Sequence, residues 1–141
     1  MNDIYSVYKK NDISTSSPLK MVLMLYDGAI TFLKKAVEFA EQGDIKNKNI
    51  YANKARDIIV EFNNSLNIQQ GGEIAVKLRS LYFFMDRHLM ISNWNNDIQG
   101  LNDVIDLMSN LREGWRDVYE QKIEIEAQYD AKEYRTAGVT V

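Results

Sequence analysis

Cysteine is absent from this sequence of 141 residues, and proline and histidine each occur only once. A chain without cysteine has no disulfide bond and no thiolate ligand for a metal, which agrees with a reducing compartment. Di-iron bundles need a Glu-x-x-His motif on each of two helices, but Met85 stands three residues before the one histidine, His88. We therefore expect no metal site and interpret His88 as a partly exposed or hydrogen-bonded residue.

Motifs for catalysis and nucleotide binding are also missing. Gly71 and Gly72 are not followed by the Gly-Lys-Ser pattern of a phosphate-binding loop. No nucleophile signature accompanies the serines and aspartates, and no group of titratable residues forms a recognisable catalytic motif. The sequence predicts no enzyme and no cofactor, and a substrate-binding enzyme of bundle architecture is the least favoured alternative.

Charge and hydropathy exclude two further classes of partner. The net charge is −3 with both signs interspersed, so there is no basic surface for nucleic acid. The longest apolar run, Met21 to Tyr26, is far shorter than the ~18 residues that a membrane span needs. The first residues do not have the pattern of a signal peptide. These observations predict a soluble cytoplasmic protein without direct membrane insertion.

Apolar residues recur at helical spacing almost throughout, which predicts an all-α chain. Ser17 as N-cap, Pro18 at the first helical position and Gly43 as C-cap bound a first helix over 17–40. Asp44 caps a second helix that ends near 66, and residues 67–72 form the next connection. A third helix follows over 73–95, and a fourth begins after Asn96 or Asp97.

Short connections between four such helices predict an antiparallel up-down-up-down four-helix bundle over residues 17–119. Residues 1–16 are interpreted as a loosely docked N-terminal arm or short helix, and residues 120–141 as an extension of the last helix with a flexible tail. The expected buried faces of the last three helices are Ile45, Tyr51, Ala52, Ala55, Ile58, Ile59, Phe62 and Leu66, then Ile74, Leu78, Leu81, Tyr82, Met85 and Leu89, then Leu101, Val104, Leu107, Met108, Leu111, Trp115, Val118 and Tyr119.

Two sets of apolar residues exceed what one buried face per helix requires. The first flanks the core face of helix 17–40, and the second lies away from the core face of helix 73–95, with Phe84 and Ile91 beside it. The sets are Met21, Leu25, Phe32 and Phe39, and Val76, Phe83, Met90 and Trp94. Each set has two interpretations: contact with a neighbouring helix, the arm or the extension, or a groove that binds a peptide client. Because two sets occur together, we favour a client-binding surface.

The segment from Ser17 to Leu33, Ser-Pro-Leu-Lys-Met-Val-Leu-Met-Leu-Tyr-Asp-Gly-Ala-Ile-Thr-Phe-Leu, resembles the first core helix of the bacterial flagellar export chaperone family FliS. Similar order and spacing continue in the later helices, so the resemblance covers roughly residues 4–119. The matching residues there are Ala55 to Leu66, Gly71 to Ala75, Leu81 to Met85, Arg87, Leu89, Asn93, Asp97, Leu101, Val104, Leu107, Leu111, Arg112 and Trp115. Phe83 and Trp94 depart from the family pattern, which is polar at the first position and smaller or aliphatic at the second.

The resemblance implies a cytoplasmic chaperone that binds the disordered C-terminal segment of flagellin. It further implies that the chaperone blocks premature polymerisation and delivers flagellin to the flagellar type III export gate without a nucleotide. An N-terminal arm covers part of the groove in this family, and Ile4, Tyr5, Val7 and Tyr8 match that arm. The alternative is a helical structural or dimerisation module without a peptide client. We expect a monomer or a weak homodimer.

Overall fold

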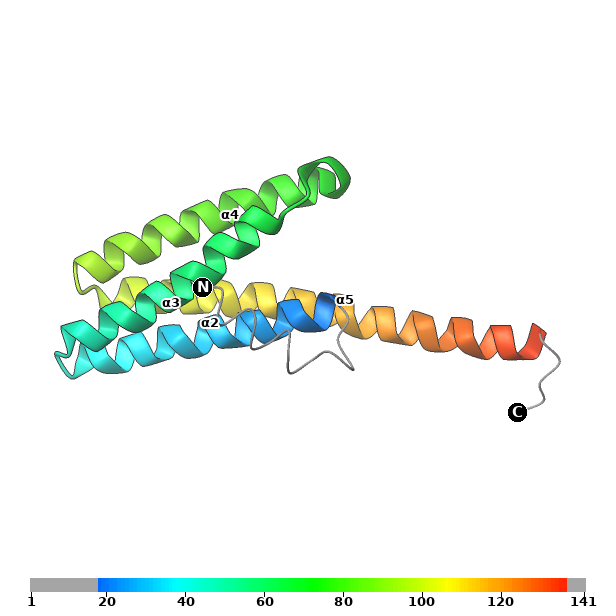
Figure 1. Cartoon of the computed structure of the whole chain (residues 1–141), viewed down its shortest axis with the longest axis horizontal. Helices are drawn as coiled ribbons and strands as arrows, with labels where there is room; N and C mark the ends of the chain where they lie inside the picture. Colours follow the sequence, from blue (N-terminus) through cyan, green and yellow to red (C-terminus); the bar gives the residue numbers. More distant parts are fainter. Residues whose placement is uncertain (1–17, 137–141) are drawn as a thin grey trace.

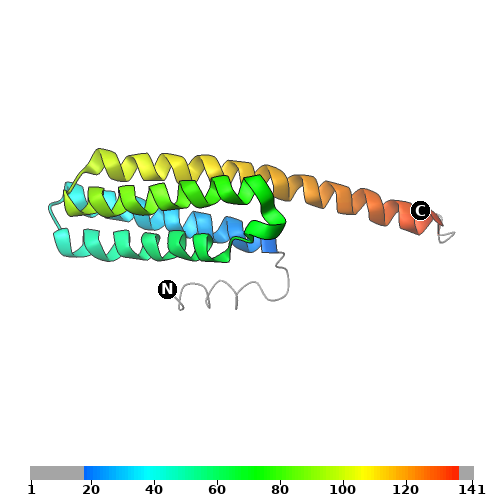
Figure 2. The same ribbon diagram turned by 90° about the horizontal axis from the view of Figure 1, so that it is seen from above.

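The structure, a computed structural model, describes residues 18–136. Within this range the chain forms four helices, α2 (Pro18–Glu41), α3 (Ile45–Ser65), α4 (Ile68–Trp94) and α5 (Ile98–Thr136). Helices α2 and α4 each pack against both α3 and α5, and successive helices run in opposite directions (Figures 1 and 2). The predicted all-α four-helix bundle is confirmed. The predicted arm over 1–16 and the N-cap Ser17 lie outside the described residues.

The turn between α2 and α3 has the predicted capping chemistry. Gly43 adopts a φ of +76°, which a residue with a side chain rarely adopts. Its N–H donates to the carbonyl of Ala40 (3.1 Å), and the N–H of Asp44 donates to the carbonyl of Phe39 (2.9 Å). This is the pattern of a helix stopped by a left-handed glycine. The Asp44 side chain then accepts from the N–H of Asn47 (3.1 Å) and starts α3.

The connection between α3 and α4 differs from the prediction for 67–72. Residues 68–71 form a helical turn, because the Asn67 side chain accepts a hydrogen bond from the N–H of Gln70 and caps it (3.1 Å). The chain bends at Gly72, whose φ of +57° and ψ of −135° interrupt α4. Of the two glycines, only Gly72 breaks the helix, and the longer part of α4 begins after it.

The core contains most of the residues that the helical spacing predicted. Its buried apolar members are Leu25, Tyr26, Ala29, Ile30, Leu33, Ala36, Ala52, Ala55, Ile58, Ile59, Phe62, Tyr82, Met85, Leu89, Leu101, Val104 and Met108. Three predicted core residues are instead exposed, Ile45 (45%), Ile74 (71%) and Val118 (46%). Ile45 is the first residue of α3, Ile74 follows the bend at Gly72, and Val118 lies on α5, whose C-terminal part extends past the other helices (Figure 1).

One buried cluster contains a side chain from every helix. The hydroxyls of Tyr26 and Tyr82 lie 2.6 Å apart, and the indole N–H of Trp115 donates to the Tyr26 hydroxyl (3.3 Å). The ring of Phe62 stacks on Tyr26 with centroids 4.6 Å apart. Burial raises the pKa of both Tyr26 and Tyr82 above the usual range, so both phenols stay neutral. The cluster therefore joins α2, α3, α4 and α5 through satisfied polar groups.

Helix α5 is much longer than its partners. It continues past the other helices to Thr136 (Figure 2), and residues 120–128 are exposed along it. Ion pairs one turn apart, Arg116 with Glu120 and Lys122 with Glu126, line this segment. Such pairs support an isolated helix by only a few tenths of a kcal/mol each, roughly 0.2–0.5. The predicted tail over 137–141 lies outside the described residues.

Helices α4 and α5 approach each other closely at Gly100. A Cβ atom added to Gly100 would lie 2.6 Å from the Cβ of Ser92, which is buried at 2% exposure. We predict that Gly100→Ala lowers the free energy of unfolding by about 1–3 kcal/mol, because one helix must shift. Gly114→Ala is the matched control, since a Cβ there meets nothing within 4 Å. Urea denaturation measures both, and equal or increased stability for both variants would contradict the close approach.

Candidate functional site

The outer face of α4 carries a row of exposed apolar side chains. Val76, Phe83, Met90 and Trp94, here called the α4 row, are 49%, 59%, 49% and 86% exposed. Phe84 and Ile91 beside them are also exposed. Several large apolar side chains exposed on one side of a helix are typical of an interaction site. The prediction that these residues lie away from the core is confirmed.

The α4 row connects two hollows at opposite ends of its helix. Val76 lines a hollow of about 490 Å³ beside the bend at Gly72. Met90 and Trp94 line a second hollow of about 640 Å³ between α3 and α4, here called the α3–α4 groove. Its other lining residues are Ile45, Lys48, Asn49, Asn53, Ile91, Asn93 and Asn96. From Val76 to Trp94 the row spans about 27 Å at 1.5 Å per residue. This length suits an extended or helical peptide.

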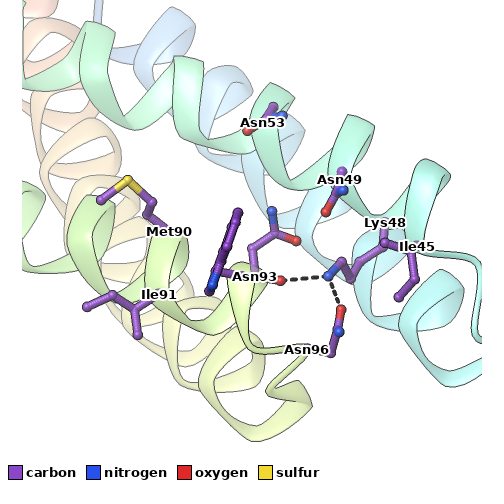
Figure 3. Close-up of a pocket in the computed structure, with 9 residues that line it drawn as sticks. Ile45, Lys48, Asn49, Asn53, Met90, Ile91, Asn93 and Asn96 are labelled. Atoms are coloured by element: carbon purple, nitrogen blue, oxygen red, sulfur yellow. Dashed lines mark hydrogen bonds between the residues drawn. The ribbon is translucent and has the colours of Figure 1, made fainter.

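The α3–α4 groove has a polar floor as well as apolar walls. The ammonium of Lys48, a residue only 1% exposed, donates to the backbone carbonyl of Asn93 (2.6 Å) and to the side-chain oxygen of Asn96 (Figure 3). Burial lowers the pKa of Lys48 from its ordinary value. The side-chain oxygen of Asn93 is buried and has no hydrogen-bond partner among the described residues. Buried polar groups are normally paired, so this oxygen requires an explanation.

The predicted set on α2 lies mostly inside the bundle. Leu25 is a core residue at 4% exposure, and Met21 and Phe32 are half-buried against the core. Phe32 and Phe39 both contact the ring of Tyr51 on α3, with centroids 6.0 and 5.5 Å apart. Phe32 also lines a small hollow of about 280 Å³ on α2. The wide apolar arc of α2 is therefore used largely by its two neighbours, α3 and α5.

The structure also bears on the predictions for His88, for metal sites and for membrane spans. His88 is part-exposed, its Nε2 lies 3.3 Å from a carboxylate oxygen of Asp103, and its ring stacks on Phe84. This agrees with its interpretation as a hydrogen-bonded boundary residue. The arm residues Ile4, Tyr5, Val7 and Tyr8 lie outside the described residues. Over 18–136 no group of three histidine, aspartate or glutamate side chains is placed to hold a metal ion. None of the four helices described is long and apolar enough to cross a membrane.

The polar half of the α3–α4 groove was not predicted. Its members are Lys48, Asn49, Asn53, Asn93 and Asn96. A signal was present for one of them, because Lys48 precedes Ala52 by four residues and Ala55 by seven, which places it on the core face of α3. A lysine at such a position needs buried acceptors. Those acceptors come from residues 45 and more positions later, which no local pattern reveals.

The sequence of the bundle matches a known protein family. The model of the family described as "Flagellar protein FliS" matches residues 1–122 of this chain. The chain belongs to the FliS family. The resemblance predicted from the sequence is therefore confirmed, and the fit covers nearly the whole bundle.

Three relatives of this FliS family member share the name "Flagellar secretion chaperone FliS". The protein of Salmonella typhimurium is 38% identical over 107 residues, which cover 75% of this chain and 79% of the relative. The protein of Vibrio cholerae is 36% identical over 119 residues, which cover 82% and 88%. The protein of Bacillus subtilis is 32% identical over 112 residues, which cover 79% and 83%. The chain is thus a chaperone of flagellar secretion and not an enzyme.

A solved structure supports the fold independently. A crystal structure described as that of a flagellar chaperone from bacteria superposes with a TM-score of 0.70 and covers 84% of this chain and 97% of its own. The two sequences are 20% identical over that match. The likeness shows that the FliS family member has the same bundle architecture.

The difference in burial between the two predicted sets has a measurable consequence. We predict that Phe83→Asp changes the free energy of unfolding by about 0.5 kcal/mol or less, because the side chain is 59% exposed. Leu25→Asp should instead abolish folding or cost several kcal/mol (roughly 3 or more), because it buries an unpaired carboxylate. Urea denaturation followed by circular dichroism compares the two. A large loss of stability in Phe83→Asp would mean that the α4 row is covered in the folded protein.

Proposed function

We propose that this FliS family member binds the C-terminal segment of flagellin along the α4 row in the cytoplasm. Binding keeps that segment from premature polymerisation, and the complex then delivers flagellin to a component of the flagellar export gate. The observation that carries the proposal is the exposed row of Val76, Phe83, Met90 and Trp94, which connects two hollows. The names of the relatives supply the flagellar context.

The composition of the α4 row suits a client that folds on binding. A disordered segment loses conformational entropy when it is ordered, so the chaperone must offer enough apolar surface to offset that cost. Methionine is flexible and aromatic rings are large, and such side chains adapt to an irregular apolar partner. The row offers three of these side chains, Phe83, Met90 and Trp94, over about 27 Å of helix.

The set on α2 is proposed to make secondary contacts with the client. Phe32 and Phe39 are half-buried, and Phe32 opens onto a small hollow, so their outer edges are available to a client that wraps around the bundle. Met21 lies at the start of the same helix and is half-buried too. Leu25 is held in the core and contacts a client only if α2 moves away from its neighbours.

The free protein is proposed to be a monomer or a weak homodimer. A permanent dimer that buried the α4 row would leave no surface for a client. Sedimentation over a concentration series separates a monomer that keeps the row open from a permanent dimer.

The client proposal predicts the outcome of calorimetry with a peptide that covers the C-terminal segment of flagellin from the same organism. We expect a saturable complex with a negative heat-capacity change, because apolar surface is buried and the peptide folds. Phe83→Asp should weaken binding by about tenfold or more, because a carboxylate replaces a ring at the centre of the row.

Ile125→Asp is the matched control for that experiment. Ile125 is 64% exposed on the part of α5 beyond the other helices, so the same kind of change is made away from the row. Equal losses in both variants would indicate a general effect of added charge. The absence of binding to the unaltered protein would refute the client itself.

The N-terminal arm, residues 1–16, is proposed to cover part of the α4 row until the client displaces it. The proposal comes from the family resemblance of Ile4, Tyr5, Val7 and Tyr8, which are apolar side chains in a polar context. Deleting residues 1–14 should tighten binding of the flagellin peptide or increase aggregation, because a competing intramolecular ligand is removed. Calorimetry and light scattering measure the two effects. Unchanged affinity and unchanged solubility would rule out a covering role.

A further inference from the structure

The α3–α4 groove contains a buried positive charge without a counter-ion. Lys48 is 1% exposed, and both of its hydrogen-bond acceptors, the Asn93 carbonyl and the Asn96 side chain, are neutral. Over residues 18–136 no ion pair joins Lys48 to a carboxylate. An ammonium group has three N–H donors, and only two are used here. A buried unpaired cation is costly, so the groove favours an anion close to Lys48.

A hydrogen-bond acceptor without a partner lies in the same groove. The side-chain oxygen of Asn93 is buried and unpaired among the described residues. Figure 3 shows the side chains of Lys48 and Asn93 directed toward each other across the space between α3 and α4. The groove is therefore lined by a cation that lacks an anion and by an acceptor that lacks a donor.

The remaining walls are apolar and the space is large enough for a ligand. Met90, Trp94 and Ile45 line the groove, and each is about half exposed or more. The volume of about 640 Å³ lies within the range of ligand-binding pockets, roughly 300–1,000 Å³. An occupant thus needs an apolar part next to its charged and hydrogen-bonding parts.

We propose that the α3–α4 groove binds the C-terminal residue of a peptide, with its carboxylate at Lys48. The main-chain N–H of that residue donates to the side-chain oxygen of Asn93, and its side chain packs on Met90 and Trp94. One terminal residue supplies all three groups within a few ångströms, and its chain leaves the groove in one direction only. Capture of a terminal carboxylate by polar groups is an established mode of peptide recognition. The proposal rests on the proposed function, because it makes the end of the flagellin segment the occupant.

The first test compares two forms of the same flagellin peptide, one with a free C-terminal carboxylate and one with a C-terminal amide. We expect the amide to bind about tenfold or more weakly, the size of one lost charge-assisted hydrogen bond. The overall charge of the protein, −3, acts in the opposite direction and favours the amide. A preference for the free carboxylate therefore reports a local cation.

A variant then locates that cation. In Lys48→Met the methionine keeps an apolar chain of similar length, and the affinities of the two peptide forms should become equal. Lys46→Met is the control, because Lys46 is exposed on the same helix and outside the groove. Circular dichroism first establishes that Lys48→Met is folded, so that the ratio of the two affinities reports the loss of the cation and not a loss of structure.

The outcomes separate this inference from the proposed function. Equal affinity of the two peptides for the unaltered protein would overturn the inference and leave the client proposal intact. A preference that persists in Lys48→Met would also overturn it, because the carboxylate would then be bound elsewhere. Failure of both peptides to bind would overturn both proposals.

Discussion

The register of the whole bundle depends on one buried hydroxyl, that of Tyr26. It lies 2.6 Å from the hydroxyl of Tyr82, it accepts from the indole of Trp115, and its ring stacks on Phe62. Each of these residues comes from a different helix. Apolar contacts tolerate small sliding or rotation, but a hydrogen bond in the core has a narrow range of geometry and is costly to leave unmade. The four helices are therefore fixed in rotation as well as in position.

That rotation determines what α4 presents to solvent. With Tyr82 directed into the core, Val76, Phe83, Met90 and Trp94 lie about 80–120° around the helix from it, at 100° per residue. Helix α4 packs against α3 and α5, and neither covers this side over the described range. The polar cluster and the exposed α4 row are two consequences of one helix orientation. A change that freed Tyr82 would alter the orientation of the α4 row without touching any residue in it.

Local patterns in the sequence predicted the helices and their boundaries well, but they predicted the burial and the contacts of individual side chains less well. Capping residues such as Gly43 and Asp44 act within one turn, so the sequence alone placed the α2–α3 turn correctly. Helical periodicity indicates which face of a helix is apolar but not how far a neighbouring helix extends along it. Periodicity therefore predicts Ile45, Ile74 and Val118 as core residues, although no neighbouring helix buries them. The set on α2 was ambiguous for the same reason. Lys48 was missed because its partners, Asn93 and Asn96, lie far away in the sequence.

The two ends of the α4 row differ in charge, which gives the surface a direction. Near Gly72 the hollow is lined by both Glu73 and Lys77, so its charges can balance each other. At the other end Lys48 has no counter-ion among the described residues, and its burial costs stability that a well-packed apolar residue would not. A flagellin segment whose carboxylate enters the α3–α4 groove must therefore run, from its N-terminal to its C-terminal end, from Val76 toward Trp94. Apolar contacts along the row do not distinguish the two possible directions of a bound chain. In this arrangement the buried cation therefore sets the chain direction of the client, and the aromatic side chains supply the contact area.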